Sequence, residues 1–566
     1  MGPHPRRWLP LPLAATIVAA TMGVAGTPGV QAAHRTAAPR PVYGGTLNMA
    51  TQSPPHVLDP ARGEDVVSGQ FTYLMFNTLV TYAPTSTRIV PSLAARWTVS
   101  PDGRTYTFYL RHGVTFSNGN PFTAQDVVYT FTRLNQAATD CPYQGSFADI
   151  VGGQAVYAGK AKALSGIRAV GRYEVVMHLV SAEPYWLNVL ALGPAAIVDP
   201  RVAASWNADL NSKTPAPIDP VGTGPFVLAP YSANSTQYVF ERNPHYFVPG
   251  LPYLAKVIIH IGASPQLQLQ QFQRGQLQAM SSFLEDTSLD GSQYLVVRQN
   301  AQLRKDYLLQ PDNGTEYLFE DVNTPPFNNQ DVREAIAYAI NKPFLTKILT
   351  NGRGEVANSI LPPAMPGYDA TMNAFPVDYA AGMAKADATA RALLKEAGYA
   401  NGINIGQFDI IQGAGDTEWA SLVVSELAAA GIKVQAKILS FPEYIDAVET
   451  GKAGFAMSFW TQDYPDPQDF MFNLFDGQQA GNNNFSRLNV PQVNRLIEKA
   501  DVMANMTQRI PLYRQAELAV LRSAAAIPVY FLWQDGLVAP NVYPKTPQIW
   551  LHPVLPSQLD RVWIER

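Results

Sequence analysis

Residues 408–438 form a predicted strand–helix–strand unit, and this unit limits the fold more than any other segment. Residues 408–411 (Phe-Asp-Ile-Ile) have the apolar character of a buried strand, residues 417–430 predict a helix that ends at Gly431, and residues 432–438 predict a second strand. Two strands joined through a helix in this way are expected to be parallel, with a right-handed crossover. The C-terminal half of the chain is therefore expected to have an α/β structure.

Further amphipathic helices are predicted in the same half. Asn329 can cap a helix whose apolar side chains recur at i, i+3, i+4, i+7 and i+8, which gives a single buried stripe. The sequence Asn341-Lys-Pro ends this helix and starts another. Residues 390–398 predict one more helix, with Gly398 at its C-terminal end.

The N-terminal part has a different character. Period-two runs at residues 96–99 and 105–110 are separated by Ser-Pro-Asp-Gly, which predicts a β-hairpin with a tight turn. Thr123 and Asp126 have the spacing of a capping box at the start of a predicted helix. Residues 45–50 predict a strand that leads into a proline-rich loop at residues 52–60. This loop contains His56, and we expect it to reach a ligand.

The segment after the apolar run of residues 455–459 is the strongest candidate for a binding site. Its sequence is Trp460-Thr-Gln-Asp463-Tyr464-Pro-Asp466-Pro, and its two prolines fix φ at their own positions and restrict the residues before them. The loop is therefore expected to be stiff. Stiff polar loops at strand ends commonly bind ligands.

The two acids in this loop are expected to have different roles. Asp466 precedes a proline and a predicted helix, so it suits the N-cap position, and Asp469 then lies in the first helical turn. Asp463 has no such local role, and a carboxylate shielded by Trp460 and Tyr464 is costly to bury without a cation. The cation is either an amino group on a ligand or a lysine or arginine elsewhere in the chain, and the local sequence favours neither.

The first 32 residues have the pattern of an export signal. Arg6 and Arg7 precede a long, alanine-rich apolar segment, and Val30-Gln-Ala32 is a site that a signal peptidase could cut, with residues 33–42 as a linker. The single cysteine, Cys141, lies far from this site, so we expect neither a lipid anchor nor an internal disulfide. The protein is expected to act in the periplasm or at the extracellular face of the cell membrane.

Charge and length exclude several classes of protein. Removing the predicted leader, which holds two arginines and no acids, takes the formal net charge from −4 to −6, and such a surface does not suit nucleic acid. No second apolar stretch is long enough to cross a bilayer. The roughly 530 remaining residues predict about three domains or lobes.

Local motifs for catalysis or metal binding are lacking. The eight histidines do not have the close spacing of a metal site, and each is most simply a surface or turn residue. Gly413 and Gly415 follow a predicted strand, but Glu418 stands where a dinucleotide-binding motif has its third glycine. We therefore expect no catalytic residue, no metal and no cofactor. An exported hydrolase is the alternative from another class, and it would need a second carboxylate near Asp463.

Several motifs, in the right order over nearly all of the mature chain, resemble the peptide-binding proteins of bacterial ABC importers, the solute-binding protein family 5. They lie at residues 43–47, 91–97, 116–128, 221–226, 242–247, 323–336 and 392–398. In peptide-binding members of this family, the Asp of a Trp-x-x-Asp pattern holds the α-ammonium group of the peptide. The pattern falls on Trp460 and Asp463, the aspartate that lacks a local role.

The resemblance implies an α/β, two-lobed periplasmic-binding-protein-like fold of the large type II cluster, with an extra domain inserted in the first lobe. Domain I would comprise residues 43–82, 206–305 and 528–566, the inserted domain II residues 83–205, and domain III, an α/β lobe, residues 306–527. The glycines at residues 222 and 224 would lie in the first lobe, where we expect a tight turn.

The resemblance also implies a function without a reaction. The protein would capture short peptides in a cleft between the lobes and deliver them to the transmembrane subunits of an ABC permease, without forming a stable oligomer. The predicted ligand-binding residues are His56, Trp460, Asp463, Tyr464, Asn483 and Asn484. Some tripeptide-handling relatives carry an arginine three residues before the Trp to receive the peptide carboxylate, but Met457 stands there in this chain. Oligosaccharide and metal-chelate ligands, which other family members carry, are the alternatives.

Overall fold

The computed structural model describes residues 40–63, 65–206, 218–232, 234–281, 289–413 and 415–565. The predicted leader and its cleavage site lie outside these residues. Residues 41–566 form one compact unit, and the fold described below is the fold of this unit. Within the described ranges, no helix is long and apolar enough to span a bilayer.

A four-stranded sheet organises the first part of the chain. The order of its strands is β1 (Thr46–Thr51), β10 (Lys256–Ile261), β9 (Gln237–Arg242) and β8 (Phe226–Leu228). The sheet is antiparallel except for the parallel pair β1–β10, and β1 confirms the strand expected at residues 45–50. Helix α1 (Val66–Met75) packs on it through Phe71, whose ring contacts those of Tyr238 and Phe240 edge-on, with centroids 5.1 and 5.0 Å away.

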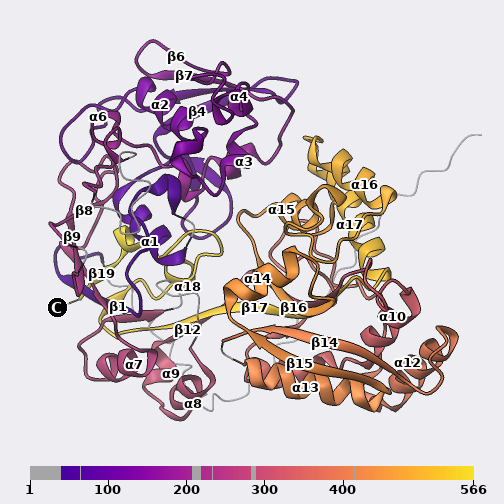
Figure 1. Ribbon diagram of the computed structural model, residues 1–566. Helices are drawn as coiled ribbons and strands as arrows, with labels where there is room; N and C mark the ends of the chain where they lie inside the picture. The colour runs from indigo at the N-terminus through magenta and orange to yellow at the C-terminus, as the bar shows by residue number, and fades with distance from the viewer. Residues whose placement is uncertain are drawn as a thin grey trace, which may run out of the picture. The chain divides into compact units, whose positions relative to one another are not determined.

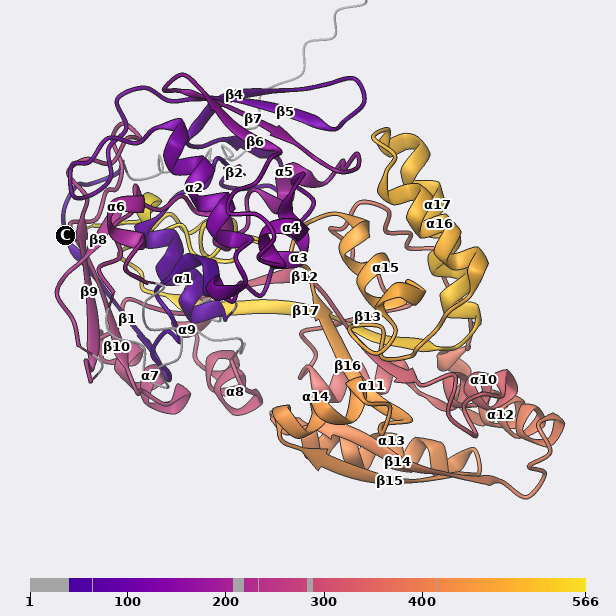
Figure 2. The ribbon, with the colours of Figure 1, turned by 45° about the horizontal axis from the view of Figure 1, so that its top comes forward.

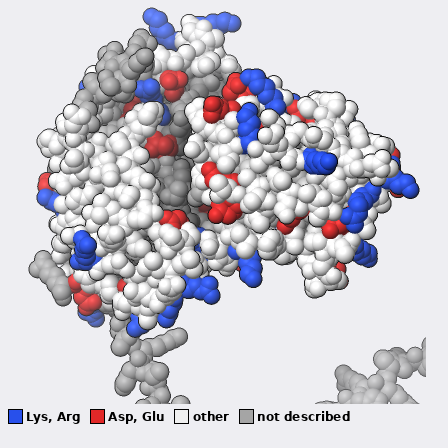
Figure 3. All heavy atoms as spheres, turned by 60° about the horizontal axis from the view of Figure 1, so that its bottom comes forward, with Lys and Arg blue, Asp and Glu red and all other residues white. Residues whose placement is uncertain are grey.

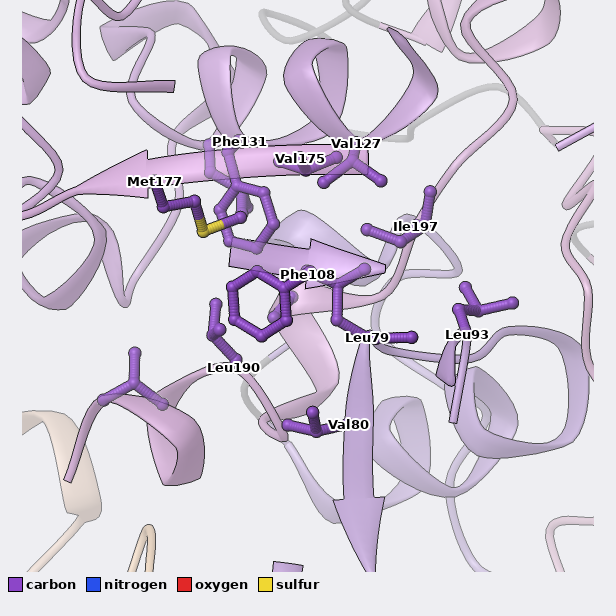
Figure 4. Close-up of a cluster of buried hydrophobic side chains, with 14 of the residues drawn as sticks. Leu79, Val80, Leu93, Phe108, Val127, Phe131, Val175, Met177, Leu190 and Ile197 are labelled. Carbon is purple, nitrogen blue, oxygen red and sulfur yellow. The ribbon is translucent and has the colours of Figure 1, made fainter. Parts of the chain in front are cut away.

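A second four-stranded sheet lies between β1 and β8 in the sequence. Its order is β4 (Ala94–Val99), β5 (Thr105–Leu110), β7 (Glu174–His178) and β6 (Ile167–Val170). The antiparallel pair β4–β5 confirms the predicted hairpin. Helix α2 (Ala124–Leu134) begins with the predicted capping box and turns Val127 and Phe131 toward Phe108, Val175 and Met177 of the sheet (Figure 4).

The largest sheet has seven strands and contains the predicted parallel unit. Its order is β11 (Ala279–Ser281), β17 (Ala526–Val538), β12 (Tyr307–Glu320), β16 (Phe455–Thr461), β14 (Ile403–Ile411) and β15 (Ile432–Leu439), with β13 (Glu355–Val356) paired to β17. Strands β14 and β15 are parallel and are joined through α13 (Asp416–Ala429), as the sequence predicts. Strand β16 extends two residues beyond the run predicted from the sequence.

Two long strands of this sheet connect two separate hydrophobic cores. Strands β12 and β17 pair antiparallel and run side by side in both ribbon views (Figures 1 and 2). Leu308 and Val538, at one end of the pair, belong to the core around β1 and α1, whereas Leu318 and Ile527, at the other end, belong to the core around β14 and α13. The pairing register shifts between Pro311 and Thr315. The domain boundaries drawn from the sequence remain a prediction, and the one at residues 527/528 falls inside β17.

The remaining helices flank these sheets (Figure 1), and two short hairpins complete the fold. The remaining helices of the first part are α3 (Gln144–Phe147), α4 (Gly153–Tyr157), α5 (Trp186–Val189), α6 (Pro200–Ala203), α7 (Pro265–Gln273), α8 (Gly291–Gln299) and α9 (Leu303–Asp306). Those of the second part are α10 (Gln330–Ala339), α11 (Lys342–Leu349), α12 (Ala384–Glu396), α14 (Phe441–Glu449), α15 (Pro467–Phe475), α16 (Pro491–Asp501), α17 (Met506–Arg522) and α18 (Pro547–Trp550). The short hairpins are β2 (Val80–Tyr82) with β3 (Ile89–Pro91), and β18 (Val542–Tyr543) with β19 (Trp563–Ile564). Single-turn 3-10 helices lie at Pro60–Arg62, Ala137–Thr139, Gly193–Ala195, Tyr379–Ala381, Gly477–Gln479 and Leu559–Arg561.

Gly222 and Gly224 have a different role from the tight turn expected of them. A Cβ atom on Gly222 would lie 2.1 Å from the carbonyl oxygen of Met75, and one on Gly224 would lie 2.3 Å from the carbonyl carbon of the same residue. Neither glycine has a positive φ. The glycines are therefore required because two backbone segments approach closely at the end of α1, and not because a turn needs the left-handed conformation.

Candidate functional site

A cleft of about 1260 Å³ lies between side chains that belong to different cores. One wall comes from β12, β16, β17 and the start of α13, and the other from α1, residues 191–194, Tyr143 and residues 552–556. A space-filling view shows a hollow with acidic side chains on its walls (Figure 3). Clefts between separate domains or cores are typical places for a small ligand to bind.

The alternation of β16 decides which of its side chains face the cleft. Met457, Phe459 and Thr461 line it, whereas Trp460, which lies between the last two, packs on the core that β16 shares with α15 and α17. Successive side chains of a strand point to opposite faces of the sheet, so Phe459 and Trp460 cannot both face a ligand. The structure therefore places Trp460 outside the residues that line the cleft.

Asp463 lies on the cleft, two residues after β16 ends, and is half-buried. The hydroxyl group of Tyr143, from the opposite wall, donates a hydrogen bond to its Oδ1 at 3.4 Å. None of the ion pairs among the described residues involves Asp463. Burial raises the pKa of its carboxyl group to about 6, and the Tyr143 hydrogen bond partly opposes this rise. Of the two partners left open by the sequence, a ligand cation is thus favoured.

A second acid, Asp469, is fully buried and holds this loop through hydrogen bonds. Asp469 accepts hydrogen bonds at Oδ2 from the Trp460 indole Nε1 (3.2 Å) and from the backbone N–H of Asp463 (3.0 Å). Burial, together with the nearby Asp463 carboxylate, raises the pKa of Asp469 well above its ordinary value. Trp460 therefore acts on Asp463 through Asp469, and it holds the loop in place instead of touching the cleft.

Asp466 caps α15, as the sequence predicts, and it also takes part in a buried ion pair. Its Oδ1 accepts a hydrogen bond from the backbone N–H of Gln468 at 3.0 Å, and its Oδ2 accepts one from Arg509 Nη1 at 2.5 Å. Arg509 also donates to the hydroxyl group of Tyr513, which in turn donates to Asp501. Cap and ion pair together occupy both carboxylate oxygens of Asp466.

Tyr464 belongs to the second half of the chain but packs against residues of the first half. It is 6% exposed, and its ring stacks on that of Tyr185 with centroids 5.8 Å apart, so it joins the core around β5 and α2. Its hydroxyl group donates to Gln468 at 2.5 Å. The structure therefore gives Tyr464 a packing role next to Asp463, away from the surface of the cleft.

The other three predicted site residues are not brought to the cleft. Asn484 is fully buried, and its amide group donates to the carbonyl oxygens of Asp476 and Leu488, so it fixes its own loop. Asn483 and the exposed His56 are also absent from the lining of the cleft. Among the residues that the structure describes, no group of three or more His, Cys, Asp or Glu side chains could hold a metal ion. Cys141 is a free, buried thiol.

Comparison with known proteins identifies the family. A model of the bacterial extracellular solute-binding proteins, family 5 Middle, matches residues 88–482. The chain belongs to this family. Di/tripeptide-binding protein 3 of Pseudomonas aeruginosa is 27% identical over 85% of this chain and 89% of its own length, and haem-binding protein A of Haemophilus influenzae is 27% identical over 80% and 81%.

Solved structures confirm the predicted fold of this family 5 protein. The structure of clavulanic acid biosynthesis oligopeptide binding protein 2 matches with a TM-score of 0.81 and 23% identity, and the match covers 93% of this chain and 97% of that one. The expected two-lobed, α/β periplasmic-binding-protein-like fold is therefore correct.

The cleft of this family 5 protein is strongly acidic. Among the described residues that line it, six are acidic and one is an arginine: Asp65, Asp290, Asp312, Glu316, Glu418, Asp463 and Arg353. The arginine is not free to receive a ligand carboxylate. Its Nη1 donates to Asp535 and to the carbonyl oxygen of Leu289, each at 2.7 Å, and its side chain is 3% exposed.

Several of these cleft residues could not be predicted from local sequence patterns. Tyr143 and Glu316 are far from Asp463 along the chain, and they reach the cleft only through the pairing of β12 with β16 and the position of α3. The alternation of β16, by contrast, could have indicated that Met457 and Phe459 share a face that Trp460 does not.

Proposed function

We propose that this protein is the substrate-binding component of an ABC importer, that it captures short peptides by their α-ammonium group at Asp463, and that it passes them to a membrane permease. The observation that carries the proposal is a cleft carboxylate with a raised pKa and no cation among its described partners. A buried carboxylate in this state gains most from a ligand that brings a positive charge.

The proposed mechanism uses the two walls of the cleft. Asp463 comes from the wall built on β16 and Tyr143 from the opposite wall, and a hydrogen bond joins them, so an ammonium group bound beside this pair contacts both walls. A charge-assisted contact of this kind contributes roughly 1.5 to 3 kcal/mol and sets the register of the peptide. Backbone hydrogen bonds and hydrated side-chain pockets supply the remaining affinity. The ligand favours the closed state because it binds both walls only in that state.

The charge of the cleft argues against the alternative ligands. Haem carries two carboxylate groups, and a cleft with six acids and one committed arginine would repel them. An oligosaccharide could stack on aromatic side chains of the cleft, but it would leave the Asp463 carboxylate without a counter-ion. A short peptide with a free amino terminus supplies the positive charge that Asp463 lacks.

A binding role, and not hydrolysis, also fits the neighbours of Asp463. Acid–base cleavage of a glycosidic bond needs a second carboxyl group on the other side of the substrate. Asp469 is fully buried and both oxygens of Asp466 are occupied, so neither of the two acids that follow Asp463 in this segment can act as that second group. We further propose that the mature protein is an exported monomer without a lipid anchor. Amino-terminal sequencing and the intact mass of the exported protein test this, and an acylated terminus would contradict it.

Calorimetric titration with one tripeptide in free, N-acetylated and C-amidated forms tests the peptide proposal. Acetylation removes the positive charge, so we expect affinity to fall about tenfold to a hundredfold. Amidation is expected to cost less, because Met457 and the committed Arg353 leave no cleft cation for the carboxylate among the described residues. Equal binding of the free and acetylated peptides would overturn the assignment of Asp463. Mass spectrometry of the same mixtures would reveal any cleavage.

A further inference from the structure

Glu316 is a second carboxyl group of the cleft that the α-ammonium contact does not use. It lies in the middle of β12, and its cross-strand neighbours are Phe459 on β16 and Tyr530 on β17. Cross-strand neighbours project to the same face of a sheet, and all three residues line the cleft. Glu316 is nevertheless only 6% exposed. Its carboxyl group thus lies at the bottom of the cleft and faces into it.

This buried carboxyl group has no cation beside it among the described residues. None of the ion pairs found there includes Glu316, and the one arginine of the cleft is held by Asp535. Burial raises the pKa of Glu316 to about 8, although a hydrogen bond with the side chain of Tyr530 lowers it. At pH 7 this carboxyl group is therefore mostly protonated in the ligand-free protein, and a cation that reaches it favours the ionised form.

Aromatic rings surround the same position. The Tyr530 ring contacts those of Trp419 and Trp533, with centroids 6.2 and 6.0 Å away. Phe459, on the other flank of Glu316, is 45% exposed, and this is a large apolar surface for a residue on a strand within the sheet. Faces of aromatic rings attract ammonium and guanidinium groups, most strongly where water is excluded. The aromatic walls and the buried carboxylate therefore favour the same kind of ligand group.

We propose that Glu316, with Phe459 and Tyr530, forms a second cation subsite that receives the side chain of a lysine or arginine in the bound peptide. This inference rests on the proposed function and narrows its substrate class to short basic peptides. The acidic character of the cleft as a whole, with Asp312 and Glu418 also among its lining residues, likewise favours a positively charged ligand.

The spacing of the two subsites limits where the basic residue can lie. Asp463 follows Phe459 by four residues, so the two are no more than roughly 13 Å apart along the backbone at about 3.3 Å per residue. Two or three residues of extended peptide together with a long side chain span this distance. We therefore expect the basic side chain at the second or third residue of the ligand, counted from the amino terminus.

Matched peptides test the inference. Four tripeptides would be titrated calorimetrically into the full mature protein: Ala-Ala-Ala, and three variants with lysine, acetyl-lysine or norleucine at the third residue, with a second series substituted at the second residue. In at least one series, the lysine peptide is expected to bind about tenfold to a hundredfold more tightly than its norleucine and acetyl-lysine counterparts. Lysine and norleucine side chains have similar lengths, so the comparison isolates the charge.

Two variants distinguish binding of lysine at this subsite from a general attraction of the acidic cleft for positive charge. Glu316→Gln should remove the lysine preference and leave the binding of Ala-Ala-Ala within about threefold, because the α-ammonium contact remains. Glu418→Gln, which removes an exposed acid that also lines the cleft, should retain most of the preference. Thermal melts establish that both variants fold. A lysine preference that survives in Glu316→Gln, or equal binding of lysine and norleucine peptides in both series, would overturn the inference. If no peptide binds at all, the proposed function itself fails.

Discussion

Asp463 and Asp466 are separated by only two residues in the loop after β16, yet their surroundings differ. Asp466 has a buried arginine and a helix N-terminus as partners, and its network continues to Tyr513 and Asp501. Asp463 has a tyrosine hydroxyl, a second acid nearby and an open cleft in front of it. A buried charge that is paired within the protein has a structural role. A buried charge without a counter-ion in the protein can instead bind a ligand of opposite charge.

The largest effect is expected from breaking the closed network. Asp466→Ala would leave the guanidinium group of Arg509 buried without its carboxylate, so we expect a loss of about 3–5 kcal/mol in the free energy of unfolding, well above the ~1 kcal/mol of a lost N-cap. Urea unfolding measures this loss. Asp446→Ala is the matched control, because its ion pair with Lys452 is exposed and should contribute under about 1 kcal/mol. If Asp466→Ala and Asp446→Ala both lower the free energy of unfolding by a similarly small amount, the Asp466–Arg509 ion pair contributes little to stability.

The next largest effect concerns binding. Asp463→Asn keeps the shape of the side chain but removes the charge that we assign to the α-ammonium contact, so peptide affinity should fall by roughly 1.5–3 kcal/mol, or about tenfold to a hundredfold. Because the burial of this carboxylate is unfavourable, the stability of the ligand-free protein at pH 7 should stay the same or rise. Calorimetric titration and thermal melts on the same samples check both statements. Unchanged affinity would remove the distinction drawn between the two acids.

The pH dependence of peptide binding provides a further test of the role assigned to Asp463. The pKa of Asp463 is raised to about 6, with Asp469 and Tyr143 facing it, so at pH 5 only about a tenth of this group is ionised and peptide affinity should be about tenfold weaker than its maximum. Above about pH 8 affinity falls again, because a free peptide amino group loses its proton there. Titrations from pH 4.5 to 9 check this profile, and the Asp463→Asn variant should lack the fall on the acid side.

The ligand-free protein should show the opposite trend in stability. The folded state keeps the proton on Asp463 up to about pH 6, whereas an unfolded aspartate releases it near pH 4, so this group lowers stability as the pH rises through that interval.

How far the sequence could predict these features depends on the range of the interactions. The hairpin, the parallel unit, the capping box at Thr123 and the Asp466 cap follow from residues close together in the chain, and the structure confirms them. Arg509 is 43 residues from Asp466, and Tyr143 is 320 residues from Asp463, so no local pattern connects them. The orientation of Trp460 and the exposure of Phe459 depend on which alternate residues of β16 face the cleft. The register of β16 against β12 decides this.

The smallest expected effect tests whether the two walls cooperate at Asp463. Tyr143→Phe removes the hydrogen bond at 3.4 Å that lowers the pKa of this carboxyl group, so affinity should fall by about 0.5–1.5 kcal/mol, and the acid side of the pH profile should move to higher pH. Tyr73→Phe is the matched control, because Tyr73 also lines the cleft but donates to the carbonyl oxygen of Ala191. A purely structural role for Tyr143 would weaken binding without moving the profile. A shift seen with Tyr143→Phe and not with Tyr73→Phe would instead show that the wall opposite β16 tunes the acid that we assign to ligand capture.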